Sequence, residues 1–588
     1  MHAAPSTCES CNALISDTTL SIPPHALRSD YVPTETEVAQ THLSIKEELR
    51  MLKEYDERIS WHRNFVDKLE IYKNMVEKRL ERRRATISGL RRLPVEVLDL
   101  IFSLVCSPIR DDECSGTTQS PFHMPTKGPI RVAAHDLSLT CAAWRQIVVS
   151  RPRLWASISL DLRYRGTTDI RPLLQASLTN SAKTPLKISF YDTGSWRWKR
   201  PVSVPAYLAG LTASIVGAYR MLFQEMSRCA VLQLSLPWEA LAPHVTGTSD
   251  VAFPQLQTFL YDIGEYDPQS TPAWFWQAAF ASPNLIFLRA SIQFGLLPHT
   301  PPYNQLTTLV LENVESVDHL HTALASSPNL EVLSLENLSH WELPGNAVAH
   351  MLPSLKHLKI SCAWPIEVWF ATFAPVRMPL LKGLSILNNL NDRSPHRHIF
   401  KLPMSFTSTL RGCGDTLQHL IIHISPVSYH ESEITDLVKS LPNLAHLQFM
   451  TYAYNAGISP CISHLFSHLA DLSCPMAMKL KSLDIRELNF CLGFHEELVE
   501  AVLSLAESRS KRTISTSGHV QDFVPVSSIR LYWTASCYDH KDCLERKVKF
   551  EASAITRARS LLQDGTACTI TQKTPKWLYN CDADFPLY

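Results

Sequence analysis

The chain has 588 residues, more than a single compact core usually holds, which predicts several domains or an array of repeats. Its 56 basic and 56 acidic residues balance, so no overall field favours nucleic acid or an anionic membrane. The 15 cysteines form no regular framework, no secretory signal opens the sequence, and no apolar run reaches the roughly 18 residues of a membrane span. We therefore expect a protein of the cytoplasm or nucleus, not secreted, with no nucleic-acid or membrane partner.

Residues 1–40 contain several prolines among polar side chains and are predicted to be disordered. Cys8 and Cys11 form a Cys-x-x-Cys pair there. No second ligand pair follows nearby, so neither a zinc site nor a redox site is supported.

Residues 41–88 lack proline and are predicted to form one long helix with a coiled-coil register. The apolar seam positions are Ile45, Leu52, Tyr55, Ile59, Val66, Leu69, Val76, Leu80 and Ile87. Glu48, His62, Lys73 and Arg83 interrupt this seam. Two alternatives follow: a homodimer through this helix, or a single helix that folds back on its own chain.

Two apolar segments follow at residues 89–156. The first, LRRLPVEVLDLIF (residues 90–102), has a proline suited to the first turn of an amphipathic helix. The second, LSLTCAAWRQIVVSRPRLW (residues 137–155), places Leu137, Cys141, Trp144 and Val148 at helical spacing before Pro152 ends the helix. Helices this short cannot bury their apolar faces completely against one another, so part of this surface is expected to contact a partner.

These segments resemble an F-box, through the Leu-Pro pair of the first and the Cys-x-x-Trp-Arg and Pro-x-Leu-Trp patterns of the second, which are similar to those of many fungal F-box proteins. The resemblance implies docking on the Skp-type adaptor of a cullin–RING ubiquitin ligase. The positions that match the family's adaptor contact are Leu93, Pro94, Leu98, Ile101 and Phe102. The alternative interpretation is an ordinary helical hairpin inside a larger core.

Residues 107–131 depart from the F-box pattern, because they are rich in proline and glycine and are predicted to form a loop insertion. The insertion is either a solvated excursion that leaves adaptor binding intact or a cover over part of the adaptor face. Since loops tolerate insertions, we favour the excursion.

A Leu-x-x-Leu-x-Leu element recurs in residues 157–535, and a proline often precedes it. Its leading leucines are Leu256, Leu285, Leu306, Leu330, Leu355, Leu381, Leu417, Leu444 and Leu480. The element resembles a degenerate leucine-rich repeat, which implies an α/β solenoid, a horseshoe of stacked strands with helices outside. Residues 536–588 are predicted to form a C-terminal cap or tail.

Residues that alternate with the core leucines should point away from the core, and in leucine-rich repeats this concave face binds the target. The candidate target-binding residues are His357, Lys359, His419, His446, Gln448 and Asp484. Gly383 interrupts the column of histidines, so only His419 and His446 would be neighbours, which is too few ligands for zinc. The Cys537, His540 and Cys543 trio also lacks a fourth ligand. We expect no metal and no cofactor.

Three functions compete. The first is a substrate receptor, in which the F-box binds the ligase adaptor and the solenoid holds a target protein of unknown identity. The second is a scaffold of coiled coil and repeats without a ligase role. The third is an enzyme, which is disfavoured because no nucleophile elbow, HExxH motif or glycine-rich phosphate loop occurs. We expect no catalytic residues.

Overall fold

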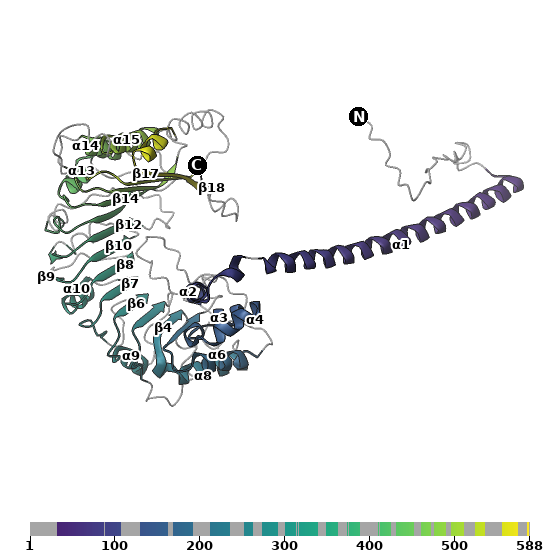
Figure 1. Ribbon diagram of the computed structural model, residues 1–588, viewed down its shortest axis with the longest axis horizontal. Coiled ribbons are helices and arrows are strands. Elements are labelled where there is room, and N and C mark those ends of the chain that lie inside the picture. Colours follow the sequence, from purple (N-terminus) through teal and green to yellow (C-terminus); the bar gives the residue numbers. More distant parts are fainter. Residues whose placement is uncertain are drawn as a thin grey trace. The chain divides into compact units, whose positions relative to one another are not determined.

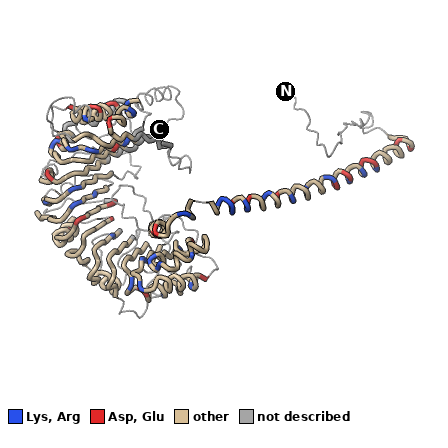
Figure 2. The backbone as a smooth tube through the Cα atoms, viewed as in Figure 1, with Lys and Arg blue, Asp and Glu red and all other residues tan. Residues whose placement is uncertain are grey.

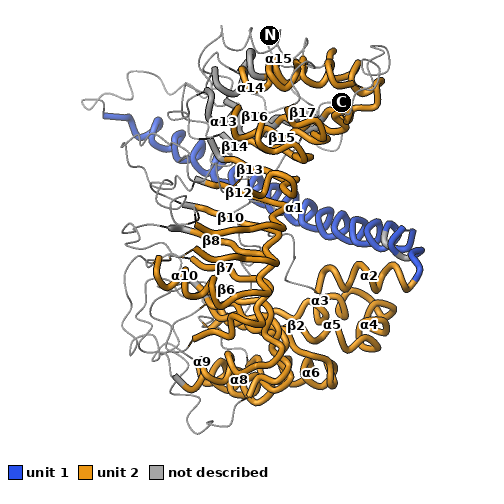
Figure 3. Tube along the Cα trace, turned by 90° about the vertical axis from the view of Figure 1, so that its left-hand side faces the viewer, with its two compact units in different colours: residues 1–94 blue, residues 95–588 orange. Residues whose placement is uncertain are grey.

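The computed structural model divides the chain into two compact units, residues 1–94 and residues 95–588, which Figure 3 colours separately. Each unit is described by itself. The described residues are 32–87, 89–106, 130–162, 169–191, 212–235, 252–262, 273–291, 300–312, 314, 317–338, 349–362, 373, 375–388, 410, 412–424, 431–451, 460–471, 476–489, 495–510, 524–534, 556–573 and 585–586.

The first unit contains the long helix α1 (Glu35–Thr86), of 52 residues, and the short 3-10 helix η2 (Gly89–Arg92). Thr34 caps α1: its hydroxyl oxygen accepts a hydrogen bond from the Glu37 backbone, while its own backbone N–H donates to the Glu37 carboxylate at 2.8 Å. The predicted long helix is thus confirmed, and it begins inside the segment 1–40 that we expected to be disordered. The cap explains this start, since it satisfies backbone donors that an uncapped helix end leaves open.

The second unit begins with four short helices, α2 (Val95–Cys106), α3 (Ala133–Thr140), α4 (Ala142–Val149) and α5 (Pro152–Trp155). The single helix expected around Leu137 to Val148 is wrong, because Cys141 has an extended backbone that separates α3 from α4. Ser138 donates its hydroxyl to the His135 carbonyl, in competition with the regular helix bond. Arg145 of α4 then donates to the Ser138 carbonyl, which satisfies the end of α3.

A sheet of 16 strands follows, and its strands lie side by side in sequence order (Figure 1). All neighbouring strands are parallel except β1 with β2 and β17 with β18. The strands are β1 (Ile130–Arg131), β2 (Ser157–Asp161), β3 (Leu186–Tyr191), β4 (Cys229–Ser235), β5 (Thr258–Asp262), β6 (Phe287–Ser291), β7 (Thr308–Glu312), β8 (Val332–Leu338), β10 (His357–Cys362), β12 (Gly383–Asn388), β13 (His419–Ile424), β14 (His446–Thr451), β15 (Ser482–Asn489), β16 (Ser528–Thr534), β17 (Ala567–Lys573) and β18 (Phe585–Pro586). A separate pair consists of β9 (His350–Met351) and β11 (Val376–Arg377).

The core leucines of this sheet align across consecutive strands. Leu288, Leu309, Leu333, Leu358, Leu384, Leu420, Leu447 and Leu483 are in register, and each is almost fully buried. The expectation of a large, mostly parallel sheet accompanied by helices is therefore confirmed. It also runs beyond its expected end at residue 535, since β17 pairs in parallel with β16.

Helices in the connections cover the buried face of the sheet. They are α6 (Arg171–Ser181), α8 (Ala213–Gln224), η6 (Met226–Arg228), α9 (Ala273–Phe280), α10 (Val317–Ala325), α13 (Glu431–Lys439), α14 (Pro460–Ala470) and α15 (His495–Ser508). Aromatic rings join the two layers. The ring centroids of Trp276 in α9 and Phe259 in β5 are 5.5 Å apart, and those of Phe466 in α14 and Phe449 in β14 are 5.8 Å apart. Burial of such apolar surface is the main stabilising contribution to this unit.

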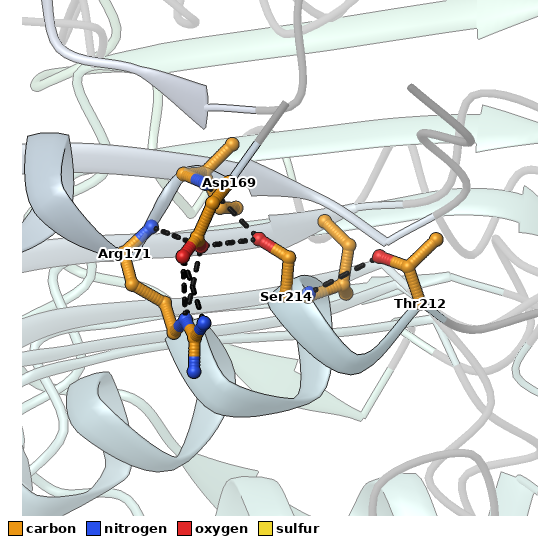
Figure 4. Close-up of polar contacts among 6 residues, drawn as sticks. Asp169, Arg171, Thr212 and Ser214 are labelled. Atoms are coloured by element: carbon orange, nitrogen blue, oxygen red, sulfur yellow. Dashed lines mark hydrogen bonds and ion pairs between the residues drawn. The ribbon is translucent and has the colours of Figure 1, made fainter. Parts of the chain in front are cut away.

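A polar cluster joins the starts of α6 and α8 (Figure 4). Arg171 donates from its guanidinium and its backbone N–H to the Asp169 carboxylate, and Ser214 donates its hydroxyl to the same carboxylate at 2.9 Å. These hydrogen bonds hold the pKa of Asp169 below its usual range. Gly217 leaves room for this arrangement, since a Cβ there would lie 2.9 Å from Arg171 Cδ.

Candidate interaction surfaces

Helix α2 presents an apolar stripe to solvent. Leu100 and Leu104 are 62 % and 68 % exposed, and Val97 and Val105 are also exposed beside the half-buried Ile101. These five residues, the α2 stripe, lie on one side because they recur at intervals of three and four. An apolar stripe of this kind on a short helix is a feature of partner-binding surfaces.

The opposite side of α2 forms the core of the helical segment. Phe102 is fully buried, with its ring centroid 4.8 Å from that of Trp144 in an edge contact, and Leu98 is only 7 % exposed. Two of the five predicted adaptor residues, Leu98 and Phe102, therefore have almost no surface to offer a partner, and this part of the prediction is corrected. Among the others, Ile101 belongs to the α2 stripe, and Leu93 is half-buried and Pro94 exposed just before the helix.

Packing and charge hold this helical segment together. The Asp99 carboxylate of α2 pairs with Arg153 and lies 3.6 Å from the Arg151 guanidinium. The indole of Trp155 donates to the Val148 carbonyl at 2.9 Å, which links α5 to α4. None of these contacts involves a residue of the α2 stripe, so the exposed side chains of the stripe take no part in them. Of the expected loop insertion, residues 107–129 lie outside the described part of the chain, while Ile130 and Arg131 form β1.

The exposed face of the sheet carries the second candidate surface. The residue that lies two positions after a leading leucine is the first residue of the strand in β6, β7, β8, β10, β12, β13, β14 and β15. Neighbours pair in register, so these residues form one column across the sheet, with His357, Gly383, His419 and His446 in succession. The column contains the apolar Phe287 and Val332 beside polar residues, and every member except Gly383 is at least partly exposed where the neighbouring leucines are buried.

A histidine row occupies the middle of this column, formed by His357, His419 and His446. The rings of His419 and His446 are stacked, with centroids 4.3 Å apart and an interplanar angle of 4°. A Cβ on Gly383 would lie 2.5 Å from His357 Nδ1, so the imidazole of His357 lies over the glycine. Gly383 stands between His357 and His419 in the register, as expected, so only His419 and His446 lie on neighbouring strands, while the glycine makes room for the ring of His357.

An ion-pair network crosses the same face beside the histidine row. Arg289 of β6 donates to Glu312 of β7 at 2.8 Å and lies 3.6 Å from Glu336 of β8, which accepts from Lys359 of β10 at 2.6 Å. Burial alone would raise the pKa of Glu336, but Lys359 and Arg289 outweigh it and lower the pKa. The leucine pattern alone did not reveal this network, although its carboxylates recur at the ends of two successive leucine elements.

The network and the burial of Asp484 narrow the set of target-binding candidates. Lys359 forms an ion pair with Glu336, and Asp484 is only 7 % exposed, so neither residue offers an accessible charge to a target. His357, His419 and His446 are exposed, and Gln448 is half-buried. The accessible part of this surface is therefore the histidine row with Gln448.

The pKa values of the three histidines in this row are all lowered. Burial, followed by repulsion from His446 and His357, lowers the pKa of His419. Burial, with the nearby charges of Lys481 and Arg530, lowers the pKa of His446, and burial with two neighbouring lysines lowers that of His357. Protonation of the row is therefore unfavourable in the folded chain.

This predicts a loss of stability in mild acid. An unfolded histidine titrates near pH 6.5, above the pKa of the folded row, so the unfolded chain binds more protons as the pH falls below about 6.5. The stability is complete above that pH and falls below it. Replacing His419 and His446 with asparagine should reduce the fall in melting temperature between about pH 8 and pH 5, measured by circular dichroism. Parallel curves for the two proteins would contradict this assignment.

Other kinds of site find no support in the described residues. No group of three or more His, Cys, Asp or Glu side chains there could hold a metal ion. No helix within the described ranges is long and apolar enough to cross a membrane. Cys8, Cys11, Cys537, His540 and Cys543 lie outside the described residues.

No protein family matches the sequence, and no curated protein matches it.

Proposed function

We propose that this chain is an F-box substrate receptor of a Skp–cullin–F-box type ubiquitin ligase. The α2 stripe and the segment before it would dock on the Skp-type adaptor, and the exposed face of the sheet would hold a target protein. The observation that carries the proposal is the α2 stripe: an apolar surface on a helical segment whose other side is already packed. In this proposal the sheet and its helices are the horseshoe of a degenerate leucine-rich-repeat solenoid.

The receptor would perform no chemistry of its own. It would hold the target near the ligase, so that attack by a target lysine takes place at an effective concentration on the order of millimolar. Adaptor and ligase work where cysteines stay reduced, which places the proposed receptor in the cytoplasm or nucleus. The competing scaffold function needs no adaptor, so adaptor binding separates the two.

The test is affinity purification of the full chain followed by quantitative mass spectrometry. The wild type should recover a Skp-type adaptor, a cullin and at least one further protein. A variant with a charge in the α2 stripe should lose the adaptor and cullin but keep the further protein. Recovery of further proteins without any adaptor from the wild type would favour the scaffold.

Target binding is predicted to depend on the histidine row. Replacing His357, His419 and His446 together with serine should reduce target recovery roughly tenfold. The reason is that a few ring-bearing side chains near the centre of an interface often contribute most of its binding energy. Adaptor recovery should stay at the wild-type level and serves as the internal control. Unchanged recovery of every adaptor-dependent protein would move the target surface away from this face.

A further inference from the structure

Helix α1 exposes an apolar seam along most of its length. Its members Ile45, Leu52, Tyr55, Ile59, Val66, Leu69, Val76 and Leu80 are each 45 % to 59 % exposed. These positions fall on one seven-residue repeat between residues 45 and 80 of the 52-residue helix. Such a repeat is the pattern by which one helix packs against another helix along a seam.

The polar residues within the seam argue against a parallel pair of two copies. In a parallel pair each seam residue faces the same residue of the second copy, so Glu48 would face Glu48 and Lys73 would face Lys73. The flanking positions would also bring Arg58 opposite Arg63 and Arg79 opposite Arg84. Like charges held together at a partly buried seam are destabilising.

An antiparallel pair converts the same residues into attractive contacts. When the two helices overlap fully, centred between residues 60 and 61, Ile45 faces Val76 and Leu52 faces Leu69. In this register Glu48 faces Lys73 of the second copy. Two of the four residues that interrupt the apolar seam, Glu48 and Lys73, thus form two symmetric ion pairs. The Lys73 ammonium also lies 3.9 Å from Glu77 of its own helix, but its side chain is 73 % exposed and can turn to the second copy.

The flanking positions agree with this register. In an antiparallel pair the residue that follows Tyr55 meets the residue that follows His62, which brings Asp56 opposite Arg63 of the second copy. The same relation brings Glu35 opposite Arg84 of the second copy. These contacts replace the arginine pairs of the parallel arrangement.

The charge along α1 changes sign from one half to the other, as the colours of Figure 2 show. Residues 35–60 contain seven acidic and four basic residues, whereas residues 61–86 contain four acidic and eight basic residues. An antiparallel pair places each acidic half beside a basic half over its whole length. This complementarity favours antiparallel pairing of two copies.

We propose that α1 pairs with α1 of a second copy of this chain as an antiparallel coiled coil, with Glu48 opposite Lys73. The sequence left dimerisation open against a folded-back helix, and between the two possible pairs of two copies the charges select the antiparallel one. Since α1 rises about 1.5 Å per residue, the two copies of the second unit would be attached at points roughly 75 Å apart. The dimer would therefore present two separate binding bodies to one large or repetitive target. This inference does not depend on the ligase function.

The test uses charge reversals in the full chain, with the dissociation constant measured by analytical ultracentrifugation. Glu48→Lys alone, or Lys73→Glu alone, should weaken association roughly tenfold or more, because each opposes like charges in two layers. The double variant Glu48→Lys with Lys73→Glu should restore association to about the wild-type value. Glu57→Lys, on the helix surface outside the seam, is the matched control and should change little.

The double variant also decides the direction of the pair. In a parallel pair, positions 48 and 73 face themselves, so the double reversal leaves like charges opposed and restores nothing. The rescued variant contains both substitutions, so rescue also excludes unfolding as the cause of the single effects. A monomeric wild type, single reversals without effect, or a double variant no stronger than the single variants would each overturn the proposal.

Discussion

Replacing Leu104 with aspartate is expected to abolish recovery of a Skp-type adaptor with the full chain. Leu104 is the most exposed residue of the α2 stripe, at 68 %, so the change removes little internal packing. A carboxylate buried without a partner in an apolar interface costs about 3 kcal/mol or more, which corresponds to binding weaker by roughly a hundredfold. Co-purification followed by quantification of the adaptor measures the effect. The melting temperature should stay near that of the wild type, since surface substitutions usually change stability by less than about 0.5 kcal/mol.

Leu562→Asp is the matched control, because Leu562 is 56 % exposed on a helical segment far along the sequence. It introduces the same charge and should leave adaptor recovery unchanged. Leu98→Asp is expected to lose the adaptor too, but through unfolding of the helical segment, and its melting curve should reveal this. Full adaptor recovery with Leu104→Asp would remove the α2 stripe from the docking surface.

The recurring leucines predicted the first residues of eight strands of the main sheet. The residue two positions after each leading leucine directly precedes the next buried leucine of the element, so it faces away from the core, because successive side chains alternate. The first residues of β6 to β15 in the main sheet are those residues. The pattern was informative since a single shift in register would have exposed the entire leucine row.

The surfaces were harder to predict than the strands. Helix α2 is apolar on both sides, so its sequence does not tell Leu98 and Phe102, which pack inside, from Leu100 and Leu104, which face solvent. Spacing restricts residues to a side of a helix, but only the neighbouring elements decide which side is covered.

Long-range polar contacts were also beyond the sequence. Arg509 of the turn after α15 is fully buried and donates to the carbonyls of Met476 and Ala477, more than thirty residues away. Ala477 has a positive φ of 44°, unusual for a residue with a side chain. Nothing in the local sequence around either residue signals this contact, which the fold alone creates.

The strongest test of the alternation is a pair of adjacent residues in β14. Leu447 is 1 % exposed and lies between Leu420 and Leu483 in the buried row, so Leu447→Ala should lower the free energy of unfolding by about 2 to 5 kcal/mol. His446, the preceding residue, is on the exposed face, and His446→Ala should cost less than about 1 kcal/mol. Urea denaturation followed by circular dichroism compares the two.

Binding is expected to show the opposite order. His446→Ala should reduce target recovery, whereas Leu447→Ala, studied well below its lowered melting temperature, should retain it because the row of side chains on the exposed face is unchanged. The buried rows support one another across strands, so the loss at Leu447 should spread to both neighbouring strands rather than stay local. Equal destabilisation by the two substitutions would mean that His446 contributes to folding as much as Leu447 does. The exposed face of β14 would then be part of the packing and would no longer be assigned as the target surface.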